Sequence, residues 1–161
     1  MEKKKKNTKL LVVTAMVAAV YMVLTLMVAP LSFGLVQVRF SEMLMLLAYI
    51  DKKYAPGLIL GCFLANCFSP FGIMDIVFGT ACTAAAMFCV TRFAKSLVSA
   101  SLWIVFCNAF IGIELYLFGS PLWLSMGMVA LGEFLSVTCC GVALFRVLER
   151  NRVLMAKLKI R

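Results

Sequence analysis

Long runs of apolar residues, separated by short polar segments, make up most of the chain. Runs of about 20 apolar residues are long enough to cross roughly 30 Å of hydrocarbon as α-helices. The interruptions at Pro30, Asp51-Lys52-Lys53, Ser69-Pro70, Arg92 and Gly119-Ser120-Pro121 divide the sequence into six such runs. The pattern therefore predicts an all-α integral membrane bundle of six transmembrane helices.

The boundaries of these spans follow from the same interruptions. The second and third spans are short for a bilayer, so a hairpin that enters the membrane without crossing it is the alternative. The lysine-rich start resembles a signal peptide, but its apolar run exceeds the ~7–15 residues of a signal core, and we interpret it as a retained span. We expect one domain over residues 1–161 with spans at about 10–29, 35–50, 54–67, 73–91, 96–118 and 122–147.

Charge fixes the expected orientation. Hydrophobic residues form 64% of the chain, and sixteen basic against seven acidic residues give a net charge of +9. The basic residues flank the apolar spans, which is the arrangement of a topology signal rather than of a nucleic-acid surface. With six spans every basic cluster falls on one side, so both termini are expected in the cytoplasm of a bacterial cell, at its membrane; four spans plus a hairpin give the same sides. The clusters are 3–6 with Lys9, 52–53, Arg92 with Lys95, and the chain from Arg146 onward.

Cysteine and histidine usage argues against a metal site. The chain has seven cysteines and no histidine, and none of the cysteines has a metal-ligand spacing. All seven lie in apolar segments, where cysteine behaves as a small hydrophobic residue. We therefore predict no metal, no cofactor and no catalytic residue.

Ionisable side chains inside the spans are the strongest functional signal, because each costs several kcal/mol in hydrocarbon and usually faces a cavity or a partner. In the predicted topology they lie in the outer half or the middle of the membrane, which indicates a cavity open to the outside. The candidates for substrate binding are Arg39, Glu42, Asn66, Asp75, Glu114, Glu133 and Trp123, with Asn108 near mid-depth.

Two of these acids share a helix face with small or weakly polar residues, which is typical of a helix contact or a cavity wall. Asp75 and Glu133 are therefore expected to point inward. The Asp75 face carries Gly79, Cys82, Thr83 and Ala86, and the Glu133 face carries Ser125, Met126, Ala130, Ser136 and Cys140.

Each candidate also has a structural explanation. Arg39 and Glu42 have helical i, i+3 spacing and could neutralise each other. Asp75 could bond a neighbouring helix, Glu133 could be protonated, and Glu114 lies near enough to the membrane surface to reach water. Asn66 could cap its helix, and Trp123 could be an interfacial anchor or stack on a ring.

Four acids against one base imply a site for a cation or a hydrogen-bond donor. A carboxylate placed on an amidine-like N–H edge gives the geometry that reads guanine-type rings. Three functions are compatible: a binding and translocating subunit, a solitary proton-coupled carrier that uses Glu133, and an intramembrane enzyme with Asp75 and Glu133 as acid and base. Against the carrier, the chain shows none of the internal repeats that such carriers usually have. Against the enzyme, it has no histidine and no Ser/Lys dyad.

A face of small residues in the first span, Ala15, Ala18 and Ala19, would allow close helix approach. This face, Val38-Arg39-Phe40-Ser41-Glu42, the run 61–83 and Gly132-Glu133 together resemble the QueT family of S components of energy-coupling factor (ECF) transporters.

The resemblance implies a substrate-binding subunit that takes a queuosine precursor from outside. Its ligand would be a cationic 7-deazaguanine such as preQ1, and its alanine face would contact a membrane coupling subunit that works with two ATPase subunits. The chain has no GxxxxGK[ST] motif, so ATP hydrolysis is expected from those partners and the chain itself is not expected to be an enzyme.

Overall fold

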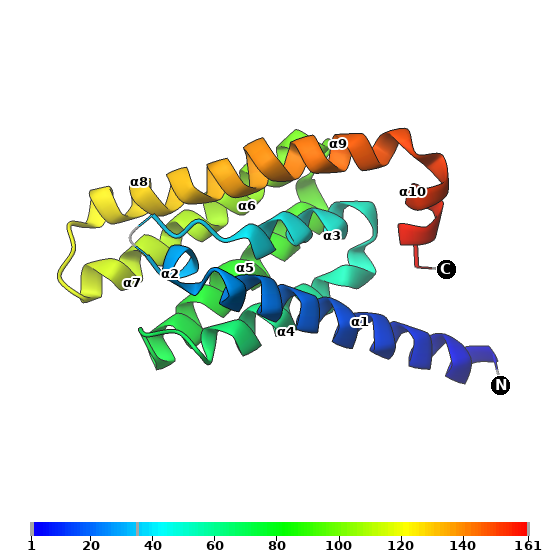
Figure 1. Cartoon of the computed structure of the whole chain (residues 1–161), viewed down its shortest axis with the longest axis horizontal. Coiled ribbons are helices and arrows are strands. Elements are labelled where there is room, and N and C mark those ends of the chain that lie inside the picture. Colours follow the sequence, from blue (N-terminus) through cyan, green and yellow to red (C-terminus); the bar gives the residue numbers. More distant parts are fainter. Residues whose placement is uncertain (1, 35, 161) are drawn as a thin grey trace.

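A computed structural model of the protein describes residues 2–34 and 36–160, which form helices and no strand (Figure 1). Leu35, the expected first residue of the second span, lies outside the described residues. The α-helices are α1 (Glu2–Met27), α2 (Ala29–Ser32), α3 (Leu47–Ile50), α4 (Ala55–Asn66), α5 (Ile73–Phe93), α6 (Leu97–Asn108), α7 (Gly112–Leu117), α8 (Leu122–Glu133), α9 (Val142–Arg150) and α10 (Arg152–Leu158). The 3₁₀ helices are η1 (Phe40–Leu46), η2 (Lys52–Tyr54) and η3 (Ala109–Ile111), and η4 (Phe134–Gly141) is a π-helix.

Four helical stretches in the described part of the chain are long and apolar enough to cross a membrane. At 1.5 Å per residue, a stretch of 21 residues is about 30 Å long. The large apolar side chains on their outer faces, such as Met27, Ile73 and Phe106, are exposed, as expected for contact with lipid. The four stretches are Asn7–Met27, Ile73–Phe93, Leu97–Leu117 and Leu122–Arg150, and they confirm an all-helical membrane protein.

The second and third expected spans are the short ones. Phe40–Ile50, which comprises η1 and α3, is shorter than a bilayer crossing, and α4 has 12 residues. Asp51 ends α3, and its Oδ1 accepts a hydrogen bond of 3.0 Å from the Lys53 backbone N–H. These lengths fit the alternative of a short hairpin better than two full crossings, and the count of six spans stays a prediction.

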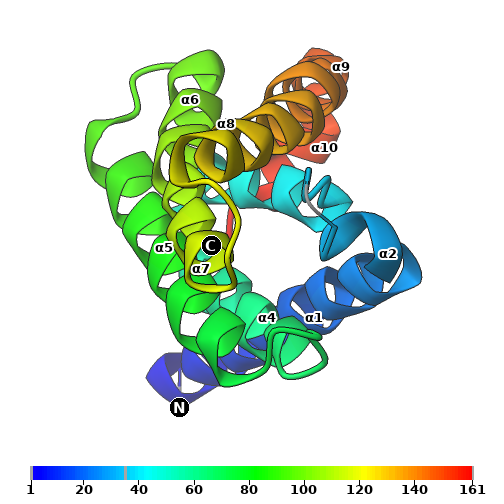
Figure 2. The same ribbon diagram turned by 90° about the vertical axis from the view of Figure 1, so that its left-hand side faces the viewer.

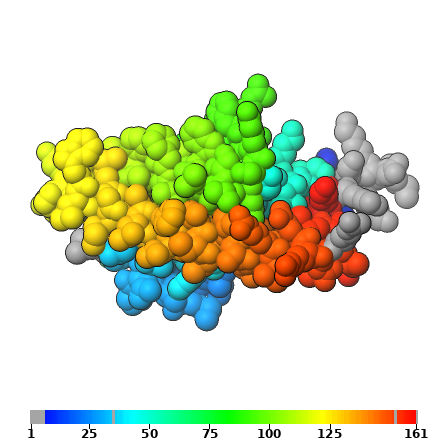
Figure 3. Space-filling view, turned by 90° about the horizontal axis from the view of Figure 1, so that it is seen from above, coloured from blue at the N-terminus to red at the C-terminus, as the bar shows by residue number. Residues whose placement is uncertain are grey.

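The helices form a closed ring when the molecule is viewed end-on (Figure 2). The ring runs α1–α4–α5–α6–η4, and η1 closes it by packing against both η4 and α1. Seen from above, α8, η4 and α9 lie lengthwise over one face of the molecule (Figure 3). The two ends of the chain lie at the same end of the molecule (Figure 1).

Glycines allow α1 and α4 to approach closely. A Cβ at Gly57 would contact the backbone of Thr14, and one at Gly61 would meet Tyr21 and the Ala18 carbonyl oxygen. This is the small-xxx-small packing of membrane helices. Ala18 is buried in this contact, whereas Ala15 and Ala19 are exposed. Ala18 therefore does not belong to the exposed alanine face that the sequence predicted.

The π-helix shifts the register of the last long helical stretch. Ser125 and Ser136 are buried with Glu133, as expected, but Cys140 is exposed and Gly141 is buried. The prediction for Cys140 was wrong because it assumed α-helical spacing, while a π-helix bonds i to i+5 and turns less per residue. Such π-helical segments often occur at functional sites, and this one begins directly after Glu133.

Candidate ligand-binding site

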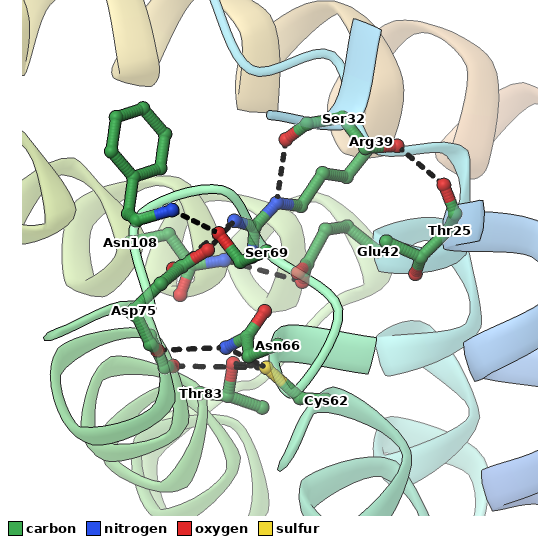
Figure 4. Close-up of polar contacts among 12 residues, drawn as sticks. Thr25, Ser32, Arg39, Glu42, Cys62, Asn66, Ser69, Asp75, Thr83 and Asn108 are labelled. Atoms are coloured by element: carbon green, nitrogen blue, oxygen red, sulfur yellow. Dashed lines mark hydrogen bonds and ion pairs between the residues drawn. The ribbon is translucent and has the colours of Figure 1, made fainter. Parts of the chain in front are cut away.

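A cluster of buried polar side chains lies inside the protein, on η1, α4, α5, α6, α7, α8 and the segment before η1. Figure 4 shows Arg39, Glu42, Asn66, Asp75 and Asn108 of this cluster. Asp75 and Glu133 belong to this cluster, and the burial of both side chains confirms that they point inward. None of the side chains in the cluster is more than 1% exposed: Gln37, Arg39, Glu42, Asn66, Asp75, Asn108, Glu114 and Glu133.

Arg39 is held by α2 and α5. Its Nη2 lies 3.4 Å from Oδ1 of Asp75, its Nε donates to the Ser32 carbonyl oxygen at 3.0 Å, and its guanidinium lies 5.4 Å from the centre of the Phe33 ring. Mutual neutralisation of Arg39 and Glu42 was the alternative to ligand contact, and the described residues show no ion pair between them. Arg39 has extended backbone angles ahead of η1, so the helical i, i+3 spacing assumed from the sequence does not apply.

Glu42 has a donor on each carboxylate oxygen. The Tyr21 hydroxyl donates to Oε1 at 2.5 Å, and the Asn108 amide donates to Oε2 at 3.2 Å. Beside this contact, the hydroxyls of Thr25 and Ser41 share a hydrogen bond of 2.7 Å. These bonds tie α1, η1 and α6 together.

Asn66 joins α4 to α5 rather than capping its own helix. Its Nδ2 donates to the backbone carbonyl of Asp75 at 2.9 Å. A carbonyl oxygen only accepts, so this bond fixes the orientation of the Asn66 amide. Gly79 leaves space for it, because a Cβ there would collide with Asn66 and approach Oδ1 of Asp75.

Glu114 and Glu133 differ from Glu42 and Asp75 in their hydrogen bonding. None of their four carboxylate oxygens has a hydrogen-bond partner among the described residues. Glu114 is 1% exposed, so the expectation that it reaches water was wrong. Glu114 interacts electrostatically with Asp75 and Arg39, and Glu133 with Arg39 and Glu42. The Asn108 amide is also close enough to stabilise the Glu133 carboxylate, but its Nδ2 donates to Glu42, and no hydrogen bond of ordinary geometry joins it to Glu133.

Buried polar atoms without partners are rare, because each one costs about 1–3 kcal/mol. Here the unpartnered atoms of the cluster are all hydrogen-bond acceptors. The Asn108 side chain donates through its Nδ2 to Glu42, and this bond fixes the orientation of the amide. The Oδ1 of Asn108 has no hydrogen-bond partner among the described residues, and the same holds for the Oδ1 of Asn66. The acceptors are Oε1 of Gln37, Oδ1 of Asn66 and Asn108, and the carboxylate oxygens of Glu114 and Glu133. This arrangement suits a ligand that is rich in N–H groups and carries positive charge.

The described residues contain no group of three histidine, cysteine or acidic side chains that could hold a metal ion.

Comparison with known protein families gives a match over most of the chain. The profile of a family described as "QueT transporter" matches residues 11–150.

The chain belongs to the QueT transporter family.

A curated protein of Lactococcus lactis subsp. cremoris (strain MG1363), named "Queuosine precursor transporter QueT", is 38% identical to this QueT chain over 78 residues. The alignment covers 47% of the chain and 46% of that protein, so it spans about half the length of the relative. No solved structure matches the chain.

For this member of the QueT family, the structure brings together most of the residues that the sequence singled out. Trp123 is the exception: it is 82% exposed and lies outside the cluster, a position that fits an interfacial anchor. The residues brought together are Arg39, Glu42, Asn66, Asp75, Glu114 and Glu133.

Two residues of this region were not singled out from the sequence: Gln37 of the cluster, and Tyr21, which bonds Glu42. Tyr21 is one of several aromatic residues in apolar spans, and Gln37 lies near the start of the second expected span. The signal for Gln37 is the sequence Val36-Gln37-Val38-Arg39-Phe40, in which polar and apolar residues alternate. Gln37 and Arg39 are buried, while the apolar residues between and around them are only partly so.

Proposed function

We propose that this protein is the substrate-binding S component of an ECF-type transporter and that it imports a queuosine precursor, a 7-deazaguanine such as preQ1. The observation that carries the proposal is the pair of buried carboxylates, Glu114 and Glu133, that have no partner among the described residues. Family membership and the name of the Lactococcus relative support the substrate class.

The chemistry of the ligand matches the unpartnered acceptors. A 7-deazaguanine has an amidine-like edge whose N–H groups fit a carboxylate in paired, charge-assisted geometry, and preQ1 adds a cationic aminomethyl group. Two carboxylates can therefore serve the two donor-rich parts of one ligand. Arg39, Glu42 and Asp75 then position the site, because their own groups already bond one another and Tyr21, Ser32 and Asn108.

The partners follow from the family and from α1. Ala15 and Ala19 are exposed one turn apart and present a small surface to a neighbouring helix. We propose that a membrane coupling subunit packs here and that two ATPase subunits supply the energy, because the chain has no GxxxxGK[ST] motif. Both termini would face the cytoplasm of a bacterial cell, with the site accessible from outside, whether the two short segments cross the membrane or form a hairpin.

Uptake by intact cells tests this function. Cells that carry the protein, the coupling subunit and both ATPases should accumulate labelled preQ1, and omission of the ATPases should abolish uptake. A solitary proton-coupled carrier is the competing function, since Glu133 is buried and unpartnered. Uptake that persists without the ATPases and collapses with the proton gradient would favour that carrier.

The alanine face has its own test. Ala15→Leu combined with Ala19→Leu should block uptake, because the bulkier side chains hold a partner helix away, and should leave preQ1 binding by the isolated subunit intact. Ala81 and Ala85 offer a matched control, since they form an exposed pair with the same spacing on α5. Loss of binding together with uptake would mean that Ala15 and Ala19 serve internal packing.

A further inference from the structure

We propose that Gln37 is a ligand-contacting residue that helps to set the specificity of this site. The inference rests on the proposed function, because it assigns a further contact to the same ligand. Three independent features of Gln37 support it: its position, its backbone conformation and its unpartnered side-chain oxygen.

Gln37 lies two residues before Arg39, in the segment that precedes η1. The burial of both side chains places them on the inner side of this segment. Both are 1% exposed, while Val36, Val38 and Phe40 are only partly buried. Polar side chains thus point into the protein, toward the face from which Arg39 reaches Asp75.

The segment lies directly against the start of the π-helical region. A Cβ at Gly132 would collide with the Val36 carbonyl oxygen and would approach the Gln37 carbonyl oxygen. Gly132 therefore permits the contact, and it is the residue immediately before Glu133. The backbone of Gln37 therefore packs against the end of α8, the helix that carries Glu133.

The backbone of Gln37 has a φ of +45°, and it is the one non-glycine residue with positive φ in the described part of the chain. This conformation is unfavourable for a residue with a Cβ and suits glycine, and strained residues of this kind cluster at ligand sites. A glycine would satisfy the turn without strain. A long polar side chain here therefore points to a role for the side chain itself.

That side chain has an acceptor to offer. Oε1 of Gln37 is buried and has no hydrogen-bond partner among the described residues. This acceptor would take an N–H group of the ligand that the carboxylates do not reach. An amide acceptor adds a requirement for a donor without adding charge, so it contributes to recognition of the heterocycle rather than of the cation.

Substitution by glycine separates this role from a structural one. Gln37→Gly removes the acceptor and also relieves the strain at positive φ. We expect its melting temperature in detergent to equal or exceed that of the parent, while its affinity for preQ1 falls by about three- to tenfold. Gln37→Asn tolerates the same φ but is one methylene too short, and it should weaken binding similarly. Gln37→Glu keeps both length and an acceptor, and it should retain binding.

The control lies on the opposite face of the same segment: Val38→Ala should leave affinity within about twofold. If the parent binds preQ1 and Gln37→Gly binds equally well, or if Gln37→Gly loses stability and affinity together, the assignment of Gln37 is wrong while the proposed function stands. If the parent itself does not bind preQ1, the proposed function fails instead.

Discussion

Four buried carboxylates lie in the cluster, on Asp75, Glu42, Glu114 and Glu133. They fall into two pairs that differ in their hydrogen-bond and ion-pair partners. Asp75 pairs with Arg39, and Glu42 receives bonds from Tyr21 and Asn108. The other two acids have no partner among the described residues. The difference separates the acids that hold the ring together from those that are available to a ligand.

Energetics sharpen this distinction. Breaking a buried ion pair by removing one partner is strongly destabilising, because the remaining charge is left uncompensated. An acid without a partner contributes no such pair, and its burial costs the folded state free energy. Substitutions at the partnered acids should therefore reduce stability, and those at the unpartnered acids should reduce ligand binding.

The largest effect is expected for Asp75→Asn. This change leaves the Arg39 guanidinium buried without a counter-charge and should lower the free energy of unfolding by about 3–5 kcal/mol. Denaturation of the purified protein in detergent measures it. Asp75→Leu combined with Arg39→Met replaces both charges by apolar groups and should recover most of the loss. Stability equal to the parent in Asp75→Asn would place Asp75 among the ligand-binding acids.

A smaller effect is expected for Tyr21→Phe. Loss of the hydroxyl leaves one Glu42 oxygen without a donor, which should cost about 1–3 kcal/mol in the same denaturation experiment. Tyr116→Phe provides the control, because Tyr116 is exposed and should change stability by less than about 0.5 kcal/mol. Equal effects of the two substitutions would show that the Tyr21–Glu42 bond does not stabilise the ring.

The smallest effect is expected at the end of the molecule that carries the chain termini. Lys52 lies in the turn between α3 and α4, and Lys95 lies between α5 and α6. Their replacement by glutamine should leave preQ1 affinity unchanged within about 0.5 kcal/mol, since neither residue belongs to the buried cluster. A tenfold change in preQ1 affinity for either variant would indicate that the binding site lies near that lysine instead.

Much of this organisation could be predicted from the sequence. Hydrophobic runs and their interruptions placed the long helices: the fourth span was expected at 73–91, and α5 is Ile73–Phe93. The rule that charge in a membrane is costly identified five of the residues in the buried cluster. Helical periodicity placed Asp75 on the same inner face as Gly79, Thr83 and Ala86, which are all buried.

The errors arise where the backbone departs from the α-helix. Helical spacing offered Glu42 as one alternative partner for Arg39, but Arg39 has extended backbone angles and pairs with Asp75, 36 residues away. Cys140 was placed on an inner face that the π-helix rotates away. Gln37 was overlooked because its positive φ and its contact with Gly132 depend on tertiary packing, which local pattern does not encode.

Titration of the purified, detergent-solubilised subunit with preQ1 tests the central claim most directly. The parent should bind saturably, and Glu133→Gln and Glu114→Gln should each weaken binding by at least about tenfold, or ~1.4 kcal/mol, since each removes a buried charge-assisted contact. Their melting temperatures without ligand should equal or exceed that of the parent. Parent-like affinity in both variants would contradict the account, because the two unpartnered acids would then have no part in binding.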